Sequence, residues 1–137
     1  MSEQEHVRVI KDAYDAFRRG DVPTMLGAIT DDVEWETQGP PQIPYAGKVR
    51  GKEAVAQFFR TLSQTEDVEA FEPRRFFADG DMVVVLGHYA ARVKATGRKA
   101  EADWVHTFTF RGDKVAKYCE YMDTAAYAKA YAVPATV

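Results

Sequence analysis

The sequence predicts an α+β domain in which three to four helices pack on one face of a curved β-sheet. Three observations support this prediction: apolar side chains at helical spacing in the first half of the chain, alternating side chains in the second half, and evenly spaced hairpin signals. Because most helical segments precede the long run of strands, the two kinds of element should form separate layers. The chain has 137 residues and is expected to form a single domain, residues 1–137.

Two helices and a short strand are predicted at the start of the chain. Residues 5–19 carry apolar side chains on one helical face: Val7, Ile10, Tyr14 and Phe17. Gly20 should end this helix, and Asp21 can cap a second, short helix. His6 is expected to lie in a frayed first turn. Residues 31–37 (DDVEWET) then alternate between two kinds of side chain, which predicts a strand.

The segment QGPPQIPYAGKVRG, residues 38–51, contains three prolines and three glycines. This composition predicts a loop, whose Ile43, Pro44 and Tyr45 could fold over a pocket as a lid. A third amphipathic helix is predicted for residues 51–62, where apolar residues recur at i, i+3, i+4 and i+7: Val55, Phe58, Phe59 and Leu62.

Four long strands and a last helix are predicted after that. Hairpin signals occur at Asp79-Gly80, Thr96-Gly97 and Gly112-Asp113. The segments around them are rich in β-forming residues and predict a four-stranded antiparallel meander: 68–78, 82–95, 98–111 and 114–122. Asp123 is placed to cap a helix over residues 124–131. A curved, mixed or antiparallel sheet closed by these helices would form a cone around a central pocket.

The composition argues against several classes of function. The net charge is −3, whereas a nucleic-acid-binding protein needs a basic surface. One cysteine allows no intrachain disulfide, no apolar run approaches the ~18 residues of a membrane span, and the N-terminus lacks a signal-peptide layout. We therefore expect a cytoplasmic protein with no nucleic-acid or membrane partner. Without a Gly-rich phosphate loop or metal-ligand spacing, neither a cofactor nor a metal is expected.

A histidine lies on the aromatic face of one predicted strand. In ADWVHTFTFRGDKV, residues 102–115, strict alternation places Trp104, His106, Phe108 and Phe110 on the same side. A neutral imidazole both donates and accepts a hydrogen bond, and it exchanges protons near physiological pH. His106 is therefore a candidate for polarising a substrate carbonyl or moving a proton. The alternative is a core histidine bonded to a backbone carbonyl.

The element order, the opening helix with Tyr14 and the ending HTFTFRGDKVAKYCEYMDTAAY resemble the SnoaL-like, ketosteroid isomerase-related branch of the nuclear transport factor 2-like superfamily. The resemblance covers about residues 5–131, and its most specific part runs from Trp104 to Asp123. It implies an open cone, a cystatin-like α+β roll, whose mouth accepts a small, mostly apolar and often carbonyl-bearing molecule. It also implies a homodimer through the outer face of the sheet.

The same resemblance suggests roles for individual residues. Tyr14 and His106 match the positions of the two donors in the oxyanion hole of ketosteroid isomerases. The general base of those isomerases follows the first strand, but here no acid occurs between Glu36 and Glu53. We therefore do not expect ordinary ketosteroid isomerase activity.

Two other acids are candidates for the base, and the sequence leaves the choice open. If Tyr118 and Met122 face inward, then so does Glu120. It would lie beside the strand of His106, and a histidine–carboxylate pair suits acid–base work. Asp123 matches the position of the base in SnoaL-like cyclases, near the end of the last strand. It also has a structural use as a helix N-cap.

The rest of the pocket wall is predicted to contact the ligand through Trp35, Tyr45, Phe59, His88, Trp104 and Tyr118. His88 lies in the strand beside that of His106, but no short-range ligand spacing supports a metal site there. Two functions fit these residues. One is a cofactor-free proton-transfer enzyme of the isomerase, cyclase or dehydratase type that acts on a carbonyl-bearing substrate. The other is a non-catalytic module that binds a ligand or a partner protein.

Overall fold

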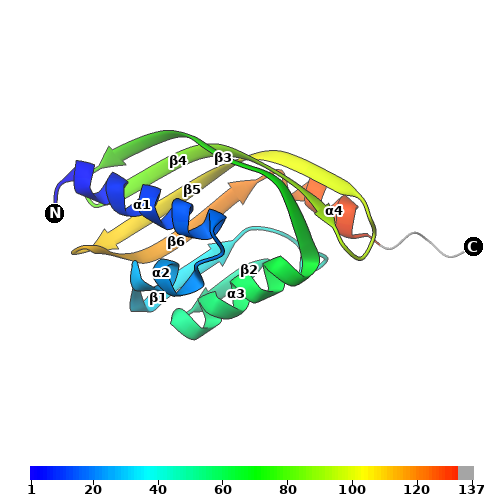
Figure 1. The fold of residues 1–137 in the computed structure, drawn as a ribbon, viewed down its shortest axis with the longest axis horizontal. Helices are drawn as coiled ribbons and strands as arrows, with labels where there is room; N and C mark the ends of the chain where they lie inside the picture. Colours follow the sequence, from blue (N-terminus) through cyan, green and yellow to red (C-terminus); the bar gives the residue numbers. More distant parts are fainter. Residues whose placement is uncertain (133–137) are drawn as a thin grey trace, which may run out of the picture.

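The computed structural model describes residues 1–132 of the chain (Figure 1). Within these residues four helices and six strands follow one another: α1 (Glu3–Arg18), α2 (Val22–Gly27), β1 (Ile29–Thr37), β2 (Gly47–Arg50), α3 (Lys52–Thr65), β3 (Glu66–Asp79), β4 (Met82–Val93), β5 (Lys99–Arg111), β6 (Lys114–Met122) and α4 (Thr124–Tyr131). The predicted succession of helices and strands is confirmed, with one added strand, β2.

The strands form one mixed sheet in the order β2-β1-β6-β5-β4-β3. Strands β3 to β6 make the predicted antiparallel meander, and β1 runs parallel to β6. Along β5, buried side chains alternate with more exposed ones, so one face of the sheet is a core face. The predicted α+β class with a curved sheet is therefore confirmed.

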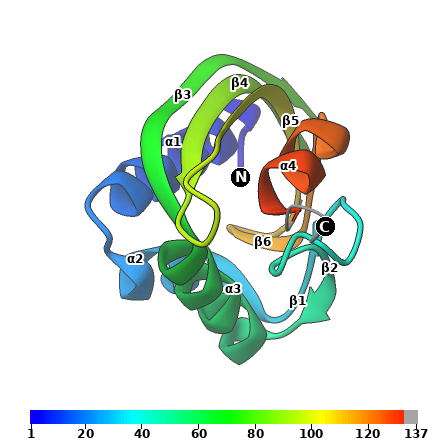
Figure 2. The ribbon, with the colours of Figure 1, turned by 90° about the vertical axis from the view of Figure 1, so that its right-hand side faces the viewer.

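The helices lie on the concave side of the sheet, which curves around them (Figure 2). Helix α1 packs on β3 and β4, α3 packs on β1, and α4 packs on β5. The most deeply buried side chains of the core come from both layers and are at most 1% exposed: Ile10, Val33, Val55, Val85 and Tyr127. None of the helices in residues 1–132 is long and apolar enough to cross a membrane.

The hairpin signals correspond to turns that need a left-handed backbone. Gly80, between β3 and β4, has a φ angle of 61°, and Gly112, between β5 and β6, has a φ angle of 66°. Glycine reaches this region without the steric cost that a Cβ atom imposes. The even spacing of such glycines therefore sets the lengths of the long strands.

The first helix begins earlier than its apolar pattern predicts. The Ser2 hydroxyl accepts a hydrogen bond from the Glu5 amide (3.1 Å), and Glu5 Oε1 accepts one from the Ser2 amide (3.0 Å). This capping box pairs amide groups that a helix end otherwise leaves free. The expectation of a frayed turn at His6 is wrong. His6 is buried, stacks on Phe110, and its Nε2 lies 3.3 Å from the Gly112 carbonyl oxygen.

The prediction of a loop for residues 38–51 is wrong at its end, where β2 pairs antiparallel with β1. All four residues of β2 are exposed, so no buried face produces an alternating pattern in the sequence. Backbone hydrogen bonds to β1 hold this edge strand in place, and they leave no pattern of side-chain types in the sequence. The preceding residues do fold inward, since Ile43 and Tyr45 are buried while Pro44 is exposed.

Gly87 in β4 makes room for the indole ring of Trp104. The two residues are opposite each other in the β4–β5 pair. A Cβ atom on Gly87 would lie only 2.2 Å from the Cζ2 ring atom of Trp104. Any side chain at this position would therefore push the ring away from the strand.

We expect Gly87→Ala to lower the free energy of unfolding by about 1–3 kcal/mol, because the added methyl group displaces the Trp104 ring. Urea unfolding followed by circular dichroism measures this change. Gly27→Ala is the matched control, since a Cβ atom at Gly27 meets nothing within 4 Å. The control should be at least as stable as the wild type, because alanine loses less backbone entropy than glycine in a helix. A Gly87→Ala protein of unchanged stability would show that Trp104 is not held against this strand.

Candidate functional site

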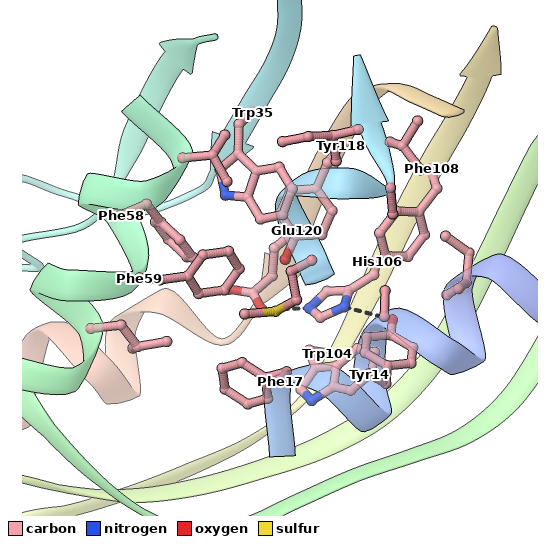
Figure 3. Close-up of a pocket in the computed structure, with 18 of the residues that line it drawn as sticks. Tyr14, Phe17, Trp35, Phe58, Phe59, Trp104, His106, Phe108, Tyr118 and Glu120 are labelled. Carbon is pink, nitrogen blue, oxygen red and sulfur yellow. Dashed lines mark hydrogen bonds and ion pairs between the residues drawn. The ribbon is translucent and has the colours of Figure 1, made fainter. Parts of the chain in front are cut away.

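A cavity lies on the core face of the sheet, walled by strands and by helices that include α1 and α3 (Figure 3). The cavity has a volume of about 100 Å³. Half of the 22 residues that line it are Phe, Tyr or Trp, among them Phe17, Trp35, Phe58, Phe59, Trp104 and Phe108. A concave, mostly apolar site with few polar groups is typical of small-molecule binding.

Three polar side chains form a hydrogen-bonded chain in the cavity wall: Tyr14 of α1, His106 of β5 and Glu120 of β6 (Figure 3). The Tyr14 hydroxyl lies 2.9 Å from His106 Nδ1, and His106 Nε2 lies 2.6 Å from Glu120 Oε2. His106 and Glu120 meet because they are opposite each other in the β5–β6 pair. Their side chains are 6% and 16% exposed, so the pair is largely withdrawn from solvent.

Both ring nitrogens of His106 are engaged in this chain. A neutral imidazole would donate from Nε2 to Glu120 and accept at Nδ1 from Tyr14, whereas an imidazolium would donate to both. Burial, and then the charge on Glu120, raise the pKa of Tyr14 well above its usual range, so its hydroxyl stays protonated. No hydrogen bond joins Glu120 Oε1 to any residue that the structure describes, and Glu120 lines the cavity.

Aromatic rings fix the plane of the imidazole. The Trp104 ring stacks on His106 with centroids 3.8 Å apart and an angle of 15° between the planes. The Tyr118 ring meets the same imidazole edge-on, at 5.1 Å and 68°. Trp35 in turn stacks on Tyr118 at 3.9 Å. With Trp104 stacked on its ring and both nitrogens bonded, His106 is held in one orientation toward Glu120.

Most of the side chains predicted for the site line this cavity: Tyr14, Trp35, Tyr45, Phe59, Trp104, His106, Tyr118 and Glu120. Alternation along β6 gives Glu120 its inward orientation, since Tyr118 and Met122 also line the cavity. Cys119 lies on the opposite face of the sheet, within 3.6 Å of the Glu36 carboxylate.

Asp123, the other candidate base, lies outside the cavity. Its Oδ1 accepts a hydrogen bond from the Ala126 amide at 3.1 Å, which makes it the N-cap of α4 as predicted. The residue is exposed and does not line the cavity. Of the two acids that the sequence left open, only Glu120 is in hydrogen-bond contact with His106.

The prediction that His88 contacts the ligand is wrong. Its neighbour Tyr89 lines the cavity, so alternation turns His88 to the outer face of β4. There His88 Nδ1 lies 2.8 Å from Asp103 Oδ1, and Nε2 lies 3.1 Å from Glu101 Oε2. Across residues 1–132, no group of three or more His, Cys, Asp or Glu side chains is arranged to hold a metal ion.

A second buried acid, Glu66, was not predicted from the sequence. It is the first residue of β3 and is 3% exposed. Three tyrosine hydroxyls donate to its carboxylate: Tyr45 at 2.5 Å, Tyr89 at 2.7 Å and Tyr131. These tyrosines come from the segment before β2, from β4 and from α4. Because the partners are far apart along the chain, no local pattern marks Glu66 as a buried acid.

The Glu66 cluster reaches the cavity through two of its tyrosines, Tyr45 and Tyr89, which line the wall. Burial, and then the charge on Glu66, raise the pKa of both hydroxyls above the usual range, so both remain donors. The charge on Glu120 also contributes to the raised pKa of Tyr89. Both carboxylates therefore act electrostatically on the same cavity wall.

This chain belongs to the SnoaL-like family, because the model of the SnoaL-like domain matches residues 10–118. The match confirms the resemblance found in the sequence. The matched segment contains Tyr14 and His106 and ends two residues before Glu120.

Solved structures with the same fold include three that are similar over nearly their whole length. An NTF2-like protein from Burkholderia xenovorans is 39% identical, with a TM-score of 0.89 over 96% of this chain and 99% of that chain. An NTF2-like protein of unknown function from Burkholderia pseudomallei is 27% identical, with a TM-score of 0.84 over 97% and 100%. TerC, co-crystallized with polyporic acid, is 26% identical, with a TM-score of 0.83 over 93% and 98%. Among curated proteins no match is found.

We expect His88 to stabilise the fold at low pH only. Its hydrogen bonds to Asp103 and then to Glu101 raise the pKa of His88 above the ordinary 6.5. Stabilisation from a raised histidine pKa is fully present below the pKa of the unfolded chain and is lost as the pH rises through the pKa of the folded protein. His88→Gln should therefore lower the Tm near pH 5.5 and leave it unchanged near pH 9, measured by calorimetry. An equal loss at both pH values would contradict this assignment.

Proposed function

We propose that this protein is a cofactor-free enzyme that moves a proton within a small carbonyl-bearing molecule, as an isomerase, cyclase or dehydratase does. The proposal rests on one observation: the side chains of Tyr14, His106 and Glu120 are linked by hydrogen bonds in a mostly apolar cavity. A hydroxyl, an imidazole and a carboxylate in mutual contact supply a donor, a proton carrier and a base at one place.

Glu120 is the general base in this proposal. His106 occupies its Oε2, and Oε1 is left to take a proton from the carbon next to the substrate carbonyl. The aromatic walls limit the access of water, so the substrate rather than solvent meets this oxygen. Return of the proton to a different carbon is an isomerisation, and attack of the carbanion on a second carbonyl is a cyclisation.

Tyr14 and His106 stabilise the charge that develops on the carbonyl oxygen. When His106 is an imidazolium, its Nδ1–H donates to the Tyr14 oxygen, and the Tyr14 O–H is then free to donate to the substrate. The role of His106 differs here from the one its sequence suggests. His106 polarises the substrate through Tyr14 rather than by direct contact, because its two ring nitrogens are already hydrogen-bonded to Tyr14 and Glu120.

The apolar body of the substrate packs against the aromatic wall in this proposal. Trp35, Tyr45, Phe59, Trp104 and Tyr118 supply that surface. TerC is a solved relative that was co-crystallized with polyporic acid, which supports the binding of a small organic molecule by this fold.

Ordinary ketosteroid isomerase chemistry is not part of the proposal, because no acid of β1 or of the segment between β1 and α3 lines the cavity. Glu36 is the last acid of β1, and its Oε1 accepts a hydrogen bond from the Cys119 thiol at 3.6 Å on the other face of the sheet. Gln38 also contacts that thiol. The same observation favours the second candidate function, a non-catalytic module that only holds a ligand in this cavity.

We expect the wild-type protein to accelerate the elimination of 5-nitrobenzisoxazole, an apolar substrate in which a base removes a carbon-bound proton while the N–O bond breaks. Glu120→Gln should lower kcat/KM by about 100-fold or more, because the amide cannot accept the proton. Absorbance of the phenolate product measures the rate.

Three further variants make this experiment specific. Asp123→Asn keeps the helix cap and should leave the rate unchanged, whereas a loss there would move the base to Asp123. Tyr14→Phe should lower kcat more than it changes KM, because its donor acts on the developing charge. Glu36→Gln serves as the control for an acid on the other face of the sheet. A wild-type protein that binds the substrate without accelerating its elimination supports the non-catalytic module.

We also propose a homodimer through the outer sheet face and a cytoplasmic location without a nucleic-acid partner. The exposed apolar side chains Phe77, Met82 and Tyr121 lie on that face and support a self-contact. The net charge of −3 supports the absence of a nucleic-acid partner.

We expect the wild type to sediment as a dimer at micromolar concentration, because burial of the outer-face apolar side chains stabilises association. Phe77→Glu should shift it to the monomer by placing a charge in that contact. Val49→Glu, a change at an exposed residue of the edge strand β2, should leave the dimer intact. A wild type that sediments as a monomer would overturn this part of the proposal.

A further inference from the structure

The cavity contains no permanently positive side chain that could hold an anion. Neither Lys nor Arg is present among its lining residues, and its titratable groups are Glu120, His106 and four tyrosines. Burial and the neighbouring carboxylates raise the pKa of those tyrosines, so they are neutral: Tyr14, Tyr45, Tyr89 and Tyr118. His106 is the one group of the lining that can carry a positive charge, and Glu120 faces it at 2.6 Å.

Arg18 is a basic side chain that lies next to a ring of this wall without lining the cavity. The Arg18 guanidinium is 5.9 Å from the centroid of the Phe71 ring, which lines the cavity. That side chain is 48% exposed and bonds to Asp15, so its charge is shared with solvent and with a carboxylate. Water screens such exposed charges, and they act weakly on a group inside the cavity.

A second negative charge lies behind the wall at Glu66. Three tyrosine hydroxyls donate to its carboxyl group, and a carboxylate can accept from all three at once. Its described partners are neutral tyrosines, so no positive side chain in residues 1–132 is bonded to it. Through Tyr45 and Tyr89 this charge adjoins the cavity.

The aromatic lining supplies no positive charge that would offset the two carboxylates. The face of an aromatic ring carries the negative part of its quadrupole, which attracts cations and repels anions. Half of the lining residues are Phe, Tyr or Trp. Two carboxylates and at most one imidazolium leave a net negative charge at the cavity wall.

We infer that the cavity selects its ligand by charge: it accepts an uncharged or positively charged carbonyl compound, such as a ketone, ester, lactone or amino ketone, and excludes carboxylates. This inference rests on the proposed function in taking the cavity as the substrate site. It narrows the substrate from any carbonyl-bearing molecule to those without an acid group that ionises at neutral pH.

Matched adamantane probes test the inference without knowledge of the natural substrate. Adamantane-1-carboxamide and adamantane-1-carboxylate have nearly the same shape and differ in charge, and 1-adamantyl methyl ketone adds a second neutral carbonyl. Trp35 and Trp104 are the only two tryptophans of the chain, and both line the cavity, so tryptophan fluorescence reports its occupancy. The adamantyl group does not absorb where tryptophan does.

We expect the amide and the ketone to bind the wild type about tenfold or more tightly than the carboxylate, because a unit charge at cavity distances from two carboxylates is repelled. Glu66→Gln should reduce this ratio severalfold, while Asp113→Asn, which removes an exposed charge in the β5–β6 hairpin, should not change it. Equal affinities, tighter binding of the carboxylate, or no binding of the neutral probes to the wild type would overturn the inference. If the Glu66 variant fails to fold, the affinities of the wild type for the three probes still test the inference.

Failure of this inference can be distinguished from failure of the proposed function, because binding selectivity and elimination are measured separately. Charge selection without elimination of 5-nitrobenzisoxazole leaves a binding module for neutral ligands, and the inference stands while the enzyme proposal fails. Elimination that depends on Glu120 without charge selection leaves the enzyme proposal in place and overturns only the ligand class.

Discussion

The pairing of buried polar groups is the constraint on which the arrangement of this molecule depends. An unpaired buried polar group costs about 1–3 kcal/mol, and more if it is charged. His106 and Glu66 are both buried in largely aromatic surroundings. The partners of His106 join α1 to β5 and β6, and the partners of Glu66 join the segment before β2, β4 and α4 to the start of β3. The contacts that offset the cost of burial thus also hold the helices over the sheet.

The same constraint gives the cavity its chemical character. A chain of bonded polar groups surrounded by aromatic rings has few alternative arrangements, so its donors and acceptors stay at fixed positions. Trp104 stacks on His106, and its own place depends on the missing side chain of Gly87. One set of packed residues therefore fixes the positions of the polar groups and surrounds them with apolar side chains. In the proposed function, a substrate would meet a site that needs little reorganisation.

Sequence patterns predicted the elements whose faces differ clearly in polarity. Three such patterns are confirmed: the aromatic alternation of β5, the apolar helical face that includes Tyr14, and the glycine turns. Each pattern reflects a requirement of the local structure. Edge strand β2 has no buried face, so its sequence shows no alternation of apolar and polar side chains. His88 was misassigned because alternation gives two faces without saying which one is inside. Glu66 escaped notice because its three tyrosines are separated along the chain and become neighbours only after folding.

By itself, the sequence predicted the succession of elements apart from β2, and its resemblance to a known family pointed to the family and to candidate site residues. The helices and strands depend on periodicity, turn residues and side-chain type, which are local properties of the chain. The tertiary structure decided which of these residues meet. The β5–β6 register sets Glu120 against His106, while the helix that begins after Asp123 uses that acid as a cap. Strand register and helix packing are long-range properties, so the choice between two acids three residues apart could be made only in the folded molecule.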